Sequence, residues 1–262
     1  MRYEAIEYAV EDGVARLTFN RPEVLNCFST TMHIEVQHAL EHFRASGGRV
    51  LILTGAGRGF CAGQDLGEDS MRPGNCRVEP GHVIDQYLKP LVLALRALPM
   101  PVIAAVNGVA AGAGANIAFA CDFVIAARSA SFVQSFCKLA LVPDCGGTWM
   151  LPRLVGEARA LGMALLGDGL SAEQAAEWGL IWQCVDDSQF GATVDTLAKK
   201  FAVAPTQALA RTKAAIHGTW EHSMREQMDI ERDAQRELAR SADYAEAVTA
   251  FFEKRRPSFR GR

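Results

Sequence analysis

Two glycine-rich turns, each directly after an apolar run, constrain the fold of this chain most. The run at 49–54 (RVLILT) leads into the turn at 54–66 (TGAGRGFCAGQDL), and the run at 102–106 (VIAAV) leads into the turn at 107–116 (NGVAAGAGAN). A near-continuous apolar run is typical of a strand that is buried on both faces. Glycine lets the backbone turn sharply and lets another group approach the main chain. We therefore expect an α/β protein whose strands end in open turns.

Hydrophobic periodicity extends this α/β pattern along the chain. Strands are expected at 5–10, 14–19, 49–54, 102–106, 123–127 and near 180–185. Helices are expected at 31–43, 83–98, 111–121, 149–154, 158–166, 172–178, 190–203 and 207–216, with one or two more in 222–255. The polar segment 67–80 is expected to be a mobile loop. We expect one domain, with an α/β core over 1–200 and a C-terminal helical region over 201–262 that makes an oligomer contact.

The composition excludes several classes of protein. The chain has 262 residues and a net charge of −3, with 27 Lys and Arg against 30 Asp and Glu, which gives no footprint for nucleic acid. No apolar run reaches the ~18 residues that a membrane span needs, and the N-terminus resembles no signal peptide. The 7 cysteines are scattered without a CxxC pair, as reduced intracellular thiols are. The expected location is the cytoplasm, with no nucleic-acid or membrane partner.

Several common active-site motifs are absent from the sequence. Neither turn spells GxGxxG, and no GxxxxGK[ST] occurs, which disfavours a dinucleotide or P-loop site. No GxSxG occurs, which disfavours a serine hydrolase. His38 and His42 lie off the apolar stripe of their expected helix, so a solvated face is favoured over a metal site. Cys145 has no histidine nearby in the sequence, which disfavours it as a nucleophile. We expect no metal.

Two features allow both a structural and a catalytic interpretation. The small residues of the turn at 107–116 could serve close packing of a helix on a strand. Alternatively, N–H groups at the start of that helix, with another from the first turn, could form an oxyanion hole. Asp144, between a proline and a cysteine that precedes a Gly-Gly pair, could cap the next helix. Alternatively, it could be a partly buried carboxylate whose apolar neighbours raise its pKa, acting as an acid or a base.

Taken together, three segments resemble the crotonase (enoyl-CoA hydratase/isomerase) superfamily: GRGFCAGQDL, VNGVAAGAGANIAFACD and VPDCGGTWMLPRLVG. SAEQAAEWGLIWQCVDD and AFFEKRRPSF add to the resemblance, which runs in the expected order from Leu17 to Arg256. It implies a spiral of ββα units with a C-terminal helical trimerisation region, in a homotrimer or a dimer of trimers. It also implies an acyl-CoA thioester as substrate and no cofactor, since coenzyme A is part of the substrate.

The resemblance also implies a role for individual residues. The backbone N–H groups of Gln64 and Ala113 are expected to hold the thioester oxygen. Many relatives have glycine at the second of these positions, and alanine retains the N–H. The coenzyme A is expected to lie along one group of residues and to be reached by another from a neighbouring subunit. The first group is Val24, Leu25, Ala62, Asp65 and Leu66, and the second is Phe251 and Lys254.

The sequence departs from the hydratases of this family at the two glutamates that activate water. Asn116 and Phe136 stand at the matching positions. An amide and a phenyl ring cannot carry out paired acid–base work, so we expect these two residues to shape the substrate pocket instead. Asp144 is the remaining carboxylate. A single base that removes a proton and returns it elsewhere suits an isomerase.

Within the superfamily, the segments CKLALVPDCGGTW, LSAEQAAEWGLIWQCVDD and ERDAQRELARSADYAEAV resemble the subgroup that converts ring-1,2-epoxyphenylacetyl-CoA to oxepin-CoA in phenylacetate breakdown. We expect that reaction, with Asp144 shuttling a proton over a thioester enolate. One alternative is a Δ3,Δ2-enoyl-CoA isomerase of fatty-acid oxidation, which would use the same atoms. Others are an enoyl-CoA hydratase, a subunit that binds acyl-CoA without catalysis, and a dehalogenase like those that carry a nucleophilic aspartate at the matching place.

Overall fold

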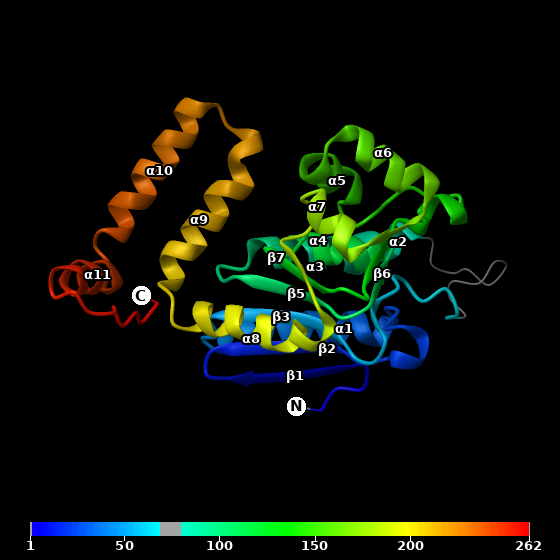
Figure 1. Ribbon diagram of the computed structural model, residues 1–262, viewed down its shortest axis with the longest axis horizontal. Coiled ribbons are helices and arrows are strands. Elements are labelled where there is room, and N and C mark those ends of the chain that lie inside the picture. The colour runs from blue at the N-terminus through cyan, green and yellow to red at the C-terminus, as the bar shows by residue number, and fades with distance from the viewer. Residues whose placement is uncertain (1, 69–79, 262) are drawn as a thin grey trace.

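A computed structural model of the chain describes residues 2–68 and 80–261. Most of the loop expected at 67–80, with Cys76, lies outside the described residues. The larger sheet has the strand order β1-β2-β3-β5-β7-β10 (Figure 1). Its strands are β1 (Ile6–Glu11), β2 (Val14–Phe19), β3 (Val50–Gly55), β5 (Val102–Val106), β7 (Phe123–Ala127) and β10 (Gln183–Val185). Only β1 and β2 pair antiparallel in this sheet, and each strand matches one that the sequence predicts.

A second sheet of four short strands was not predicted. It has the order β4-β6-β8-β9 and consists of β4 (Gly59–Cys61), β6 (Val109–Ala111), β8 (Ser131–Val133) and β9 (Gly169–Ser171). Three residues are too few for an alternating pattern to be recognised, and β4 and β6 lie inside the two glycine-rich turns. β4 and β6 pair in parallel, with Gly59 opposite Val109. The small sheet therefore brings the two turns together.

The helices agree with the expected ones except at a few boundaries. They are α1 (Thr30–Ala45), α2 (Pro80–Val83), η3 (Ile84–Leu88), α3 (Lys89–Ala97), α4 (Ala113–Phe119), α5 (Gly147–Val155), α6 (Glu157–Leu166), α7 (Ala172–Glu177), α8 (Asp187–Ala202), α9 (Thr206–Gly218), α10 (Met224–Leu238) and α11 (Ala242–Phe252). Shorter helical turns are η1 (Pro22–Val24), η4 (Ser135–Leu139) and η5 (Thr219–Glu221). The start expected at residue 111 is wrong, because Ala111 belongs to β6 and α4 begins at Ala113.

The larger sheet is buried on both faces, as its apolar runs require. Along β3, Leu51 and Leu53 belong to the core on one face, which includes residues of α1, α3 and α4. Val50 and Ile52 belong to the core on the other face, which α8 covers. This alternation is the period of two that a pleated strand imposes.

The C-terminal helices extend from the core (Figure 1). α10 and α11 carry large apolar side chains that are exposed: Met224, Met228, Ile230, Tyr244, Val248, Phe251 and Phe252. An exposed apolar patch of this kind is typical of a protein–protein contact. Within the described ranges, no helix combines the length and the apolar character that crossing a membrane requires.

Lys213 fastens α9 to the core. Its Nζ donates to the carbonyl oxygens of Leu95 (3.1 Å) and Met100 (3.2 Å) and to the carboxylate of Asp122 (2.8 Å). The side chains of Lys213 and Asp122 are only 10% and 12% exposed. The three acceptors match the three N–H bonds of an ammonium group.

Lys213→Ala is expected to lower the free energy of unfolding by about 3–5 kcal/mol, because it leaves the Asp122 carboxylate buried without its cation. The measurement is urea unfolding followed by circular dichroism. Lys199→Ala is the control, because Lys199 is exposed on α8 and its loss should change stability by less than about 0.5 kcal/mol. Equal stability of the two variants would contradict the structural role of Lys213.

Candidate active site

The two glycine-rich turns meet at two glycines: Gly114 has no room for a side chain, and Gly63 has a left-handed backbone. A Cβ atom on Gly114 would lie 2.2 Å from the carbonyl oxygen of Cys61. A Cβ atom on Gly63 would lie 3.4 Å from the backbone nitrogen of Ala113, and Gly63 also has a φ of +97°. Glycine at both positions therefore allows the backbone of Gln64 to lie beside the start of α4.

Phe28 holds the backbone on both sides of Gln64 and leaves the N–H of Gln64 unused. The N–H of Phe28 donates to the carbonyl oxygen of Gly63 (2.8 Å), and the N–H of Asp65 donates to the carbonyl oxygen of Phe28 (3.0 Å). In this parallel bridge the hydrogen bonds involve the residues on either side of Gln64. The Gln64 N–H consequently points away from Phe28.

The N–H of Ala113 stands at the first position of α4. The backbone before it is unusual, because Gly112 has φ 53° and ψ −126°. The N–H of Asn116 makes the first hydrogen bond of the helix, to the carbonyl oxygen of Gly112 at 3.2 Å. The Ala113 N–H therefore has no acceptor within the helix, as is general for the first turn.

The side chain of Asp144 does not cap α5, so that structural interpretation is wrong. The cap position is occupied by Gly146, and no side chain accepts a hydrogen bond there. Cys145 and Gly146 both have left-handed backbones, with φ 50° and 75°. The carbonyl oxygen of Asp144 accepts the N–H of Gly147 at 2.8 Å.

Asp144 is a partly buried carboxyl group with an unused oxygen. Among the side chains of residues 2–68 and 80–261, its Oδ1 is the only buried nitrogen or oxygen atom without a hydrogen-bond partner. Burial raises the pKa of Asp144, and a hydrogen bond with Cys145 opposes this in part. Burial and then the Asp144 charge raise the pKa of the Cys145 thiol far above its usual range. Cys145 is therefore not a ready thiolate, which agrees with the sequence argument.

Asn116 belongs to the first turn of α4, and Phe136 lies against Gly112, which precedes that turn. Asn116 is 0% exposed, and its Nδ2 donates to the carbonyl oxygen of Asp144 at 2.9 Å. Its Oδ1 accepts from Nε2 of the equally buried Gln134 at 2.9 Å. The ring of Phe136 lies 3.7 Å from where a Cβ atom on Gly112 would be. Asn116 thus supports the backbone of Asp144, a contact that the sequence did not reveal.

Five residues expected along the coenzyme A gather beside Gln64. The carbonyl oxygen of Leu25 accepts the N–H of Ala62 at 3.0 Å. Val24 is the last residue of η1, directly before Leu25. The carboxylate of Asp65 pairs with Arg21 at 2.8 Å. Leu66 follows on the surface and is 48% exposed.

A buried amide that the sequence did not reveal supports this group. Asn26 is 0% exposed and has a φ of 58°. Its side chain accepts the N–H of Arg21 (2.8 Å) and donates to the carbonyl oxygens of Ala56 (2.9 Å) and Gly59 (2.8 Å). The Asn26 side chain therefore joins Arg21 to the first glycine-rich turn. No local pattern in the sequence indicates this role, because the carbonyl partners of Asn26 lie 30 and 33 residues away.

The structure does not bring Phe251 and Lys254 to this group within one chain. Phe251 is 78% exposed on α11, and Lys254 follows that helix with a φ of 55°. Figure 1 shows α11 on the far side of α9 from the core. A contact with the site of the same chain is therefore absent among the described residues.

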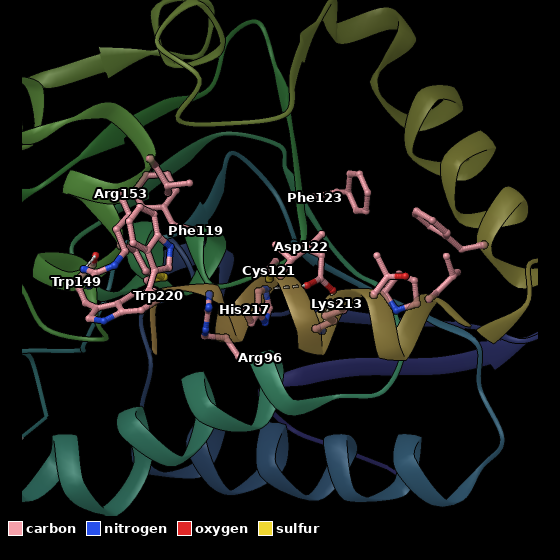
Figure 2. A pocket seen from close by; sticks show the side chains of 17 residues that line it. Arg96, Phe119, Cys121, Asp122, Phe123, Trp149, Arg153, Lys213, His217 and Trp220 are labelled. Carbon is pink, nitrogen blue, oxygen red and sulfur yellow. Dashed lines mark hydrogen bonds and ion pairs between the residues drawn. The ribbon is translucent and has the colours of Figure 1, made fainter. Parts of the chain in front are cut away.

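A cavity of about 420 Å³ lies at the other end of α4 and is separate from this site. Its lining includes Phe119, the last residue of α4, and Cys121 just after it, but not Asp144, Gln64 or Ala113. Figure 2 shows Trp149, Arg153 and Trp220 together on one side of this cavity. The Arg153 guanidinium lies 4.0 Å from the centre of the Trp149 ring. The cavity is a gap between α9 and the core.

Neither His217 nor the pair of His38 and His42 has the features of a catalytic centre. His217, in that cavity, has its pKa lowered to about 4 by burial and by the charges of Arg96 and Lys213. His38 and His42 contact tyrosine hydroxyls near the surface. In the part of the chain that the structure describes, no cluster of three His, Cys, Asp or Glu side chains is placed to hold a metal ion.

Comparison with known proteins gives consistent results. The family model for enoyl-CoA hydratase/isomerase matches residues 9–262. The chain is 53% identical over 254 residues to the 1,2-epoxyphenylacetyl-CoA isomerase of Escherichia coli K12, covering 97% of each chain. It is 45% identical to a probable enoyl-CoA hydratase of Rhodobacter capsulatus, covering 100% of both. The crystal structure of an enoyl-CoA hydratase from Bacillus anthracis matches with a TM-score of 0.92 at 33% identity, covering 99% of this chain and 100% of that one.

Burial of Asp144 predicts a specific dependence of stability on pH. Because its pKa is raised above the ordinary 3.8, the folded state holds this proton more tightly than the unfolded chain does. Stability is therefore lost as the pH rises through the raised pKa. Asp144→Asn, which cannot ionise, is expected to be more stable than the wild type at pH 7 and similar near pH ~3. Urea unfolding at several pH values measures this, with Asp168→Asn on the surface as control. A constant difference at all pH values would contradict it.

Proposed function

This chain belongs to the enoyl-CoA hydratase/isomerase (crotonase) family, which confirms the expected family and fold, and from that membership we propose that it isomerises ring-1,2-epoxyphenylacetyl-CoA to oxepin-CoA. The relative from E. coli is named 1,2-epoxyphenylacetyl-CoA isomerase. The observation that carries the proposal is the buried, unpartnered Oδ1 of Asp144 beside the first turn of α4. A carboxylate oxygen without a hydrogen-bond partner is free to accept a proton from a substrate.

In this proposal the two glycine-rich turns stabilise an enolate. The N–H groups of Gln64 and Ala113 hold the thioester oxygen, where negative charge develops as the α-proton leaves. Loss of one such donor typically costs roughly 3–4 kcal/mol of transition-state stabilisation. Because the donors are backbone groups on packed turns, they need little reorganisation during the reaction.

Asp144 moves the proton. Its carboxylate takes one proton from the carbon between the thioester carbonyl and the ring, and the C–C bond of the epoxide opens to give a seven-membered ring. Asp144 then returns the proton to a ring carbon, so that substrate and product contain the same atoms. The raised pKa of Asp144 brings it closer to neutral pH and suits a group that must both accept and release a proton.

The residues at the hydratase positions support an isomerase. The amide of Asn116 is engaged on both atoms, by the carbonyl oxygen of Asp144 and by Gln134. The ring of Phe136 cannot activate water. A Δ3,Δ2-enoyl-CoA isomerase would use the same donors and the same base, so substrate specificity decides between the two reactions.

We further propose that the enzyme works in the cytoplasm as a homotrimer or a dimer of trimers. The exposed apolar side chains of α10 and α11 support an oligomer contact. Phe251 and Lys254 are then brought to the coenzyme A that a neighbouring subunit binds along Val24, Leu25, Ala62, Asp65 and Leu66. The position of α11 beyond α9 from the core (Figure 1) is consistent with that arrangement.

Purified enzyme is expected to convert 1,2-epoxyphenylacetyl-CoA to oxepin-CoA, identified by retention time and ultraviolet spectrum because the masses are equal. Asp144→Asn should reduce kcat by about 10²–10⁴-fold, the usual contribution of a positioned base, while binding is retained. Asp168→Asn should leave turnover unchanged. Conversion of a Δ3-enoyl-CoA but not of the epoxide would favour the alternative isomerase.

Mixing of subunits tests the role of Lys254. Lys254→Ala is expected to raise KM for the acyl-CoA and leave kcat unchanged, because the lysine contacts the coenzyme A and not the reacting carbons. When subunits with Lys254→Ala are reassembled with subunits carrying Asp144→Asn, some sites combine an intact Asp144 with an intact Lys254 of the neighbour. Those sites should regain the wild-type KM. No recovery in mixed oligomers would place Lys254 in its own subunit's site or in none.

A further inference from the structure

His33 joins the side chain of Gln64 to the residue that holds the Gln64 backbone. His33 lies on α1 and is buried. Its Nε2 lies 2.8 Å from Oε1 of Gln64. Its ring stacks on the ring of Phe28, with centroids 4.8 Å apart and an interplanar angle of 26°. Phe28 also makes hydrogen bonds to the backbone on both sides of Gln64. The side chain and the backbone of Gln64 are therefore held by two residues that contact each other.

These contacts matter because the peptide that carries the Gln64 N–H lies outside the named strands, and its carbonyl oxygen is held by the N–H of Phe28 at an isolated bridge. Gly63 has a φ of +97° and lies outside the named strands. Glycine permits many backbone conformations, so its peptide could rotate and turn the following N–H. Phe28 holds the carbonyl oxygen of this peptide and the N–H of Asp65, and His33 holds the Gln64 side chain. Together they remove the rotations that would redirect the Gln64 N–H.

We infer that His33 is a positioning residue, which holds the Gln64 N–H at the angle needed to bind the thioester oxygen. The inference rests on the proposed function, in which that N–H is an oxyanion donor. His33 touches no reacting atom in this arrangement. It acts through Gln64 and belongs to a different part of the chain, 31 residues earlier.

The surroundings of His33 suit a neutral, stationary imidazole. A second ring, that of Tyr87 on η3, also stacks on the His33 imidazole, with ring centroids 4.8 Å apart and an interplanar angle of 11°. Burial lowers the pKa of His33. A neutral imidazole with its proton on Nε2 donates to Oε1 of Gln64. The stacked rings fix the direction in which this donor points, so the hydrogen bond has a defined geometry.

The decisive variant is His33→Phe, which keeps an aromatic ring between Phe28 and Tyr87 and removes the hydrogen bond. We expect kcat to fall about tenfold, less than the 10²–10³-fold loss seen when an oxyanion donor is deleted, with KM for the acyl-CoA unchanged. Gln64→Leu should have a similar effect, and the double variant should lose no more than either single variant. His38→Phe is the matched control, because His38 is a solvent-exposed histidine of the same helix. If the fall in kcat of the double variant equals the product of the two single falls, His33 does not act through Gln64 and the inference is overturned.

A spectroscopic measurement separates positioning from a purely structural role. Phenylacetyl-CoA labelled with ¹³C at the thioester carbonyl is bound to each protein, and the carbonyl stretch is recorded by infrared difference spectroscopy. The wild type is expected to lower the frequency, since hydrogen bonds weaken the C=O bond, and His33→Phe to lower it less. An unchanged frequency in His33→Phe would overturn the inference, even if thermal stability falls.

The same measurement distinguishes failure of the inference from failure of the proposed function. A lowered frequency in the wild type without turnover of the epoxide would reject the proposed substrate and leave the role of His33 standing if His33→Phe reduces the shift. No lowering in the wild type would reject both the oxyanion hole and the positioning of its donor.

Discussion

The contact between the two glycine-rich turns is the constraint on which the rest of this structure depends. β4 and β6 are only three residues long, and their pairing has an irregular register. α4, which follows β6, can lie against β4 because Gly114 has no side chain where the carbonyl oxygen of Cys61 lies. A methyl group there would separate the small sheet from α4 and with it the two N–H groups. The turns follow directly from β3 and β5, two buried strands of the larger sheet. The packed core therefore fixes the positions of the Gln64 and Ala113 N–H groups.

The first turn of α4 supports the other half of the site as well. Ala113 offers its N–H, and one turn later Asn116 bonds the backbone of Asp144. Donor and carboxylate are therefore positioned by the same short helix. The buried Oδ1 of Asp144 has no hydrogen-bond partner. Leaving such an atom unpaired typically lowers the stability of a folded protein by about 1–3 kcal/mol. The hydrogen bond between the amides of Asn116 and Gln134 offsets part of this loss of stability. Both side chains are fully buried, and a hydrogen bond is stronger in the low dielectric of the interior.

The sequence predicts the parts of this protein whose pattern is local. The strands at 14–19, 102–106 and 123–127 have the expected bounds, because four or more apolar residues mark a buried strand. The small sheet was missed, because three residues carry no period. The supporting amides were missed for a different reason. Asn26 and Gln134 act on partners 33 and 18 residues away, and His33 acts on one 31 residues away. Only the folded chain creates these pairs, whereas Gln64, Ala113 and Asp144 were identified through a resemblance that covers whole segments.

The amide at position 116 holds the backbone of Asp144 through a hydrogen bond that a carboxylate at 116 could not donate. Nδ2 of Asn116 must donate to the carbonyl oxygen of Asp144, and an ionised carboxylate has no proton to give. A charge at 116 would also be fully buried and close to Asp144, and like charges raise each other's pKa. One of the two groups would then stay protonated, or the loop at 144–147 would move away. The packing around Asp144 therefore disfavours a carboxylate at 116, one of the two positions that carry glutamate in hydratases, and in the proposed function Asn116 supports the single base by holding its backbone.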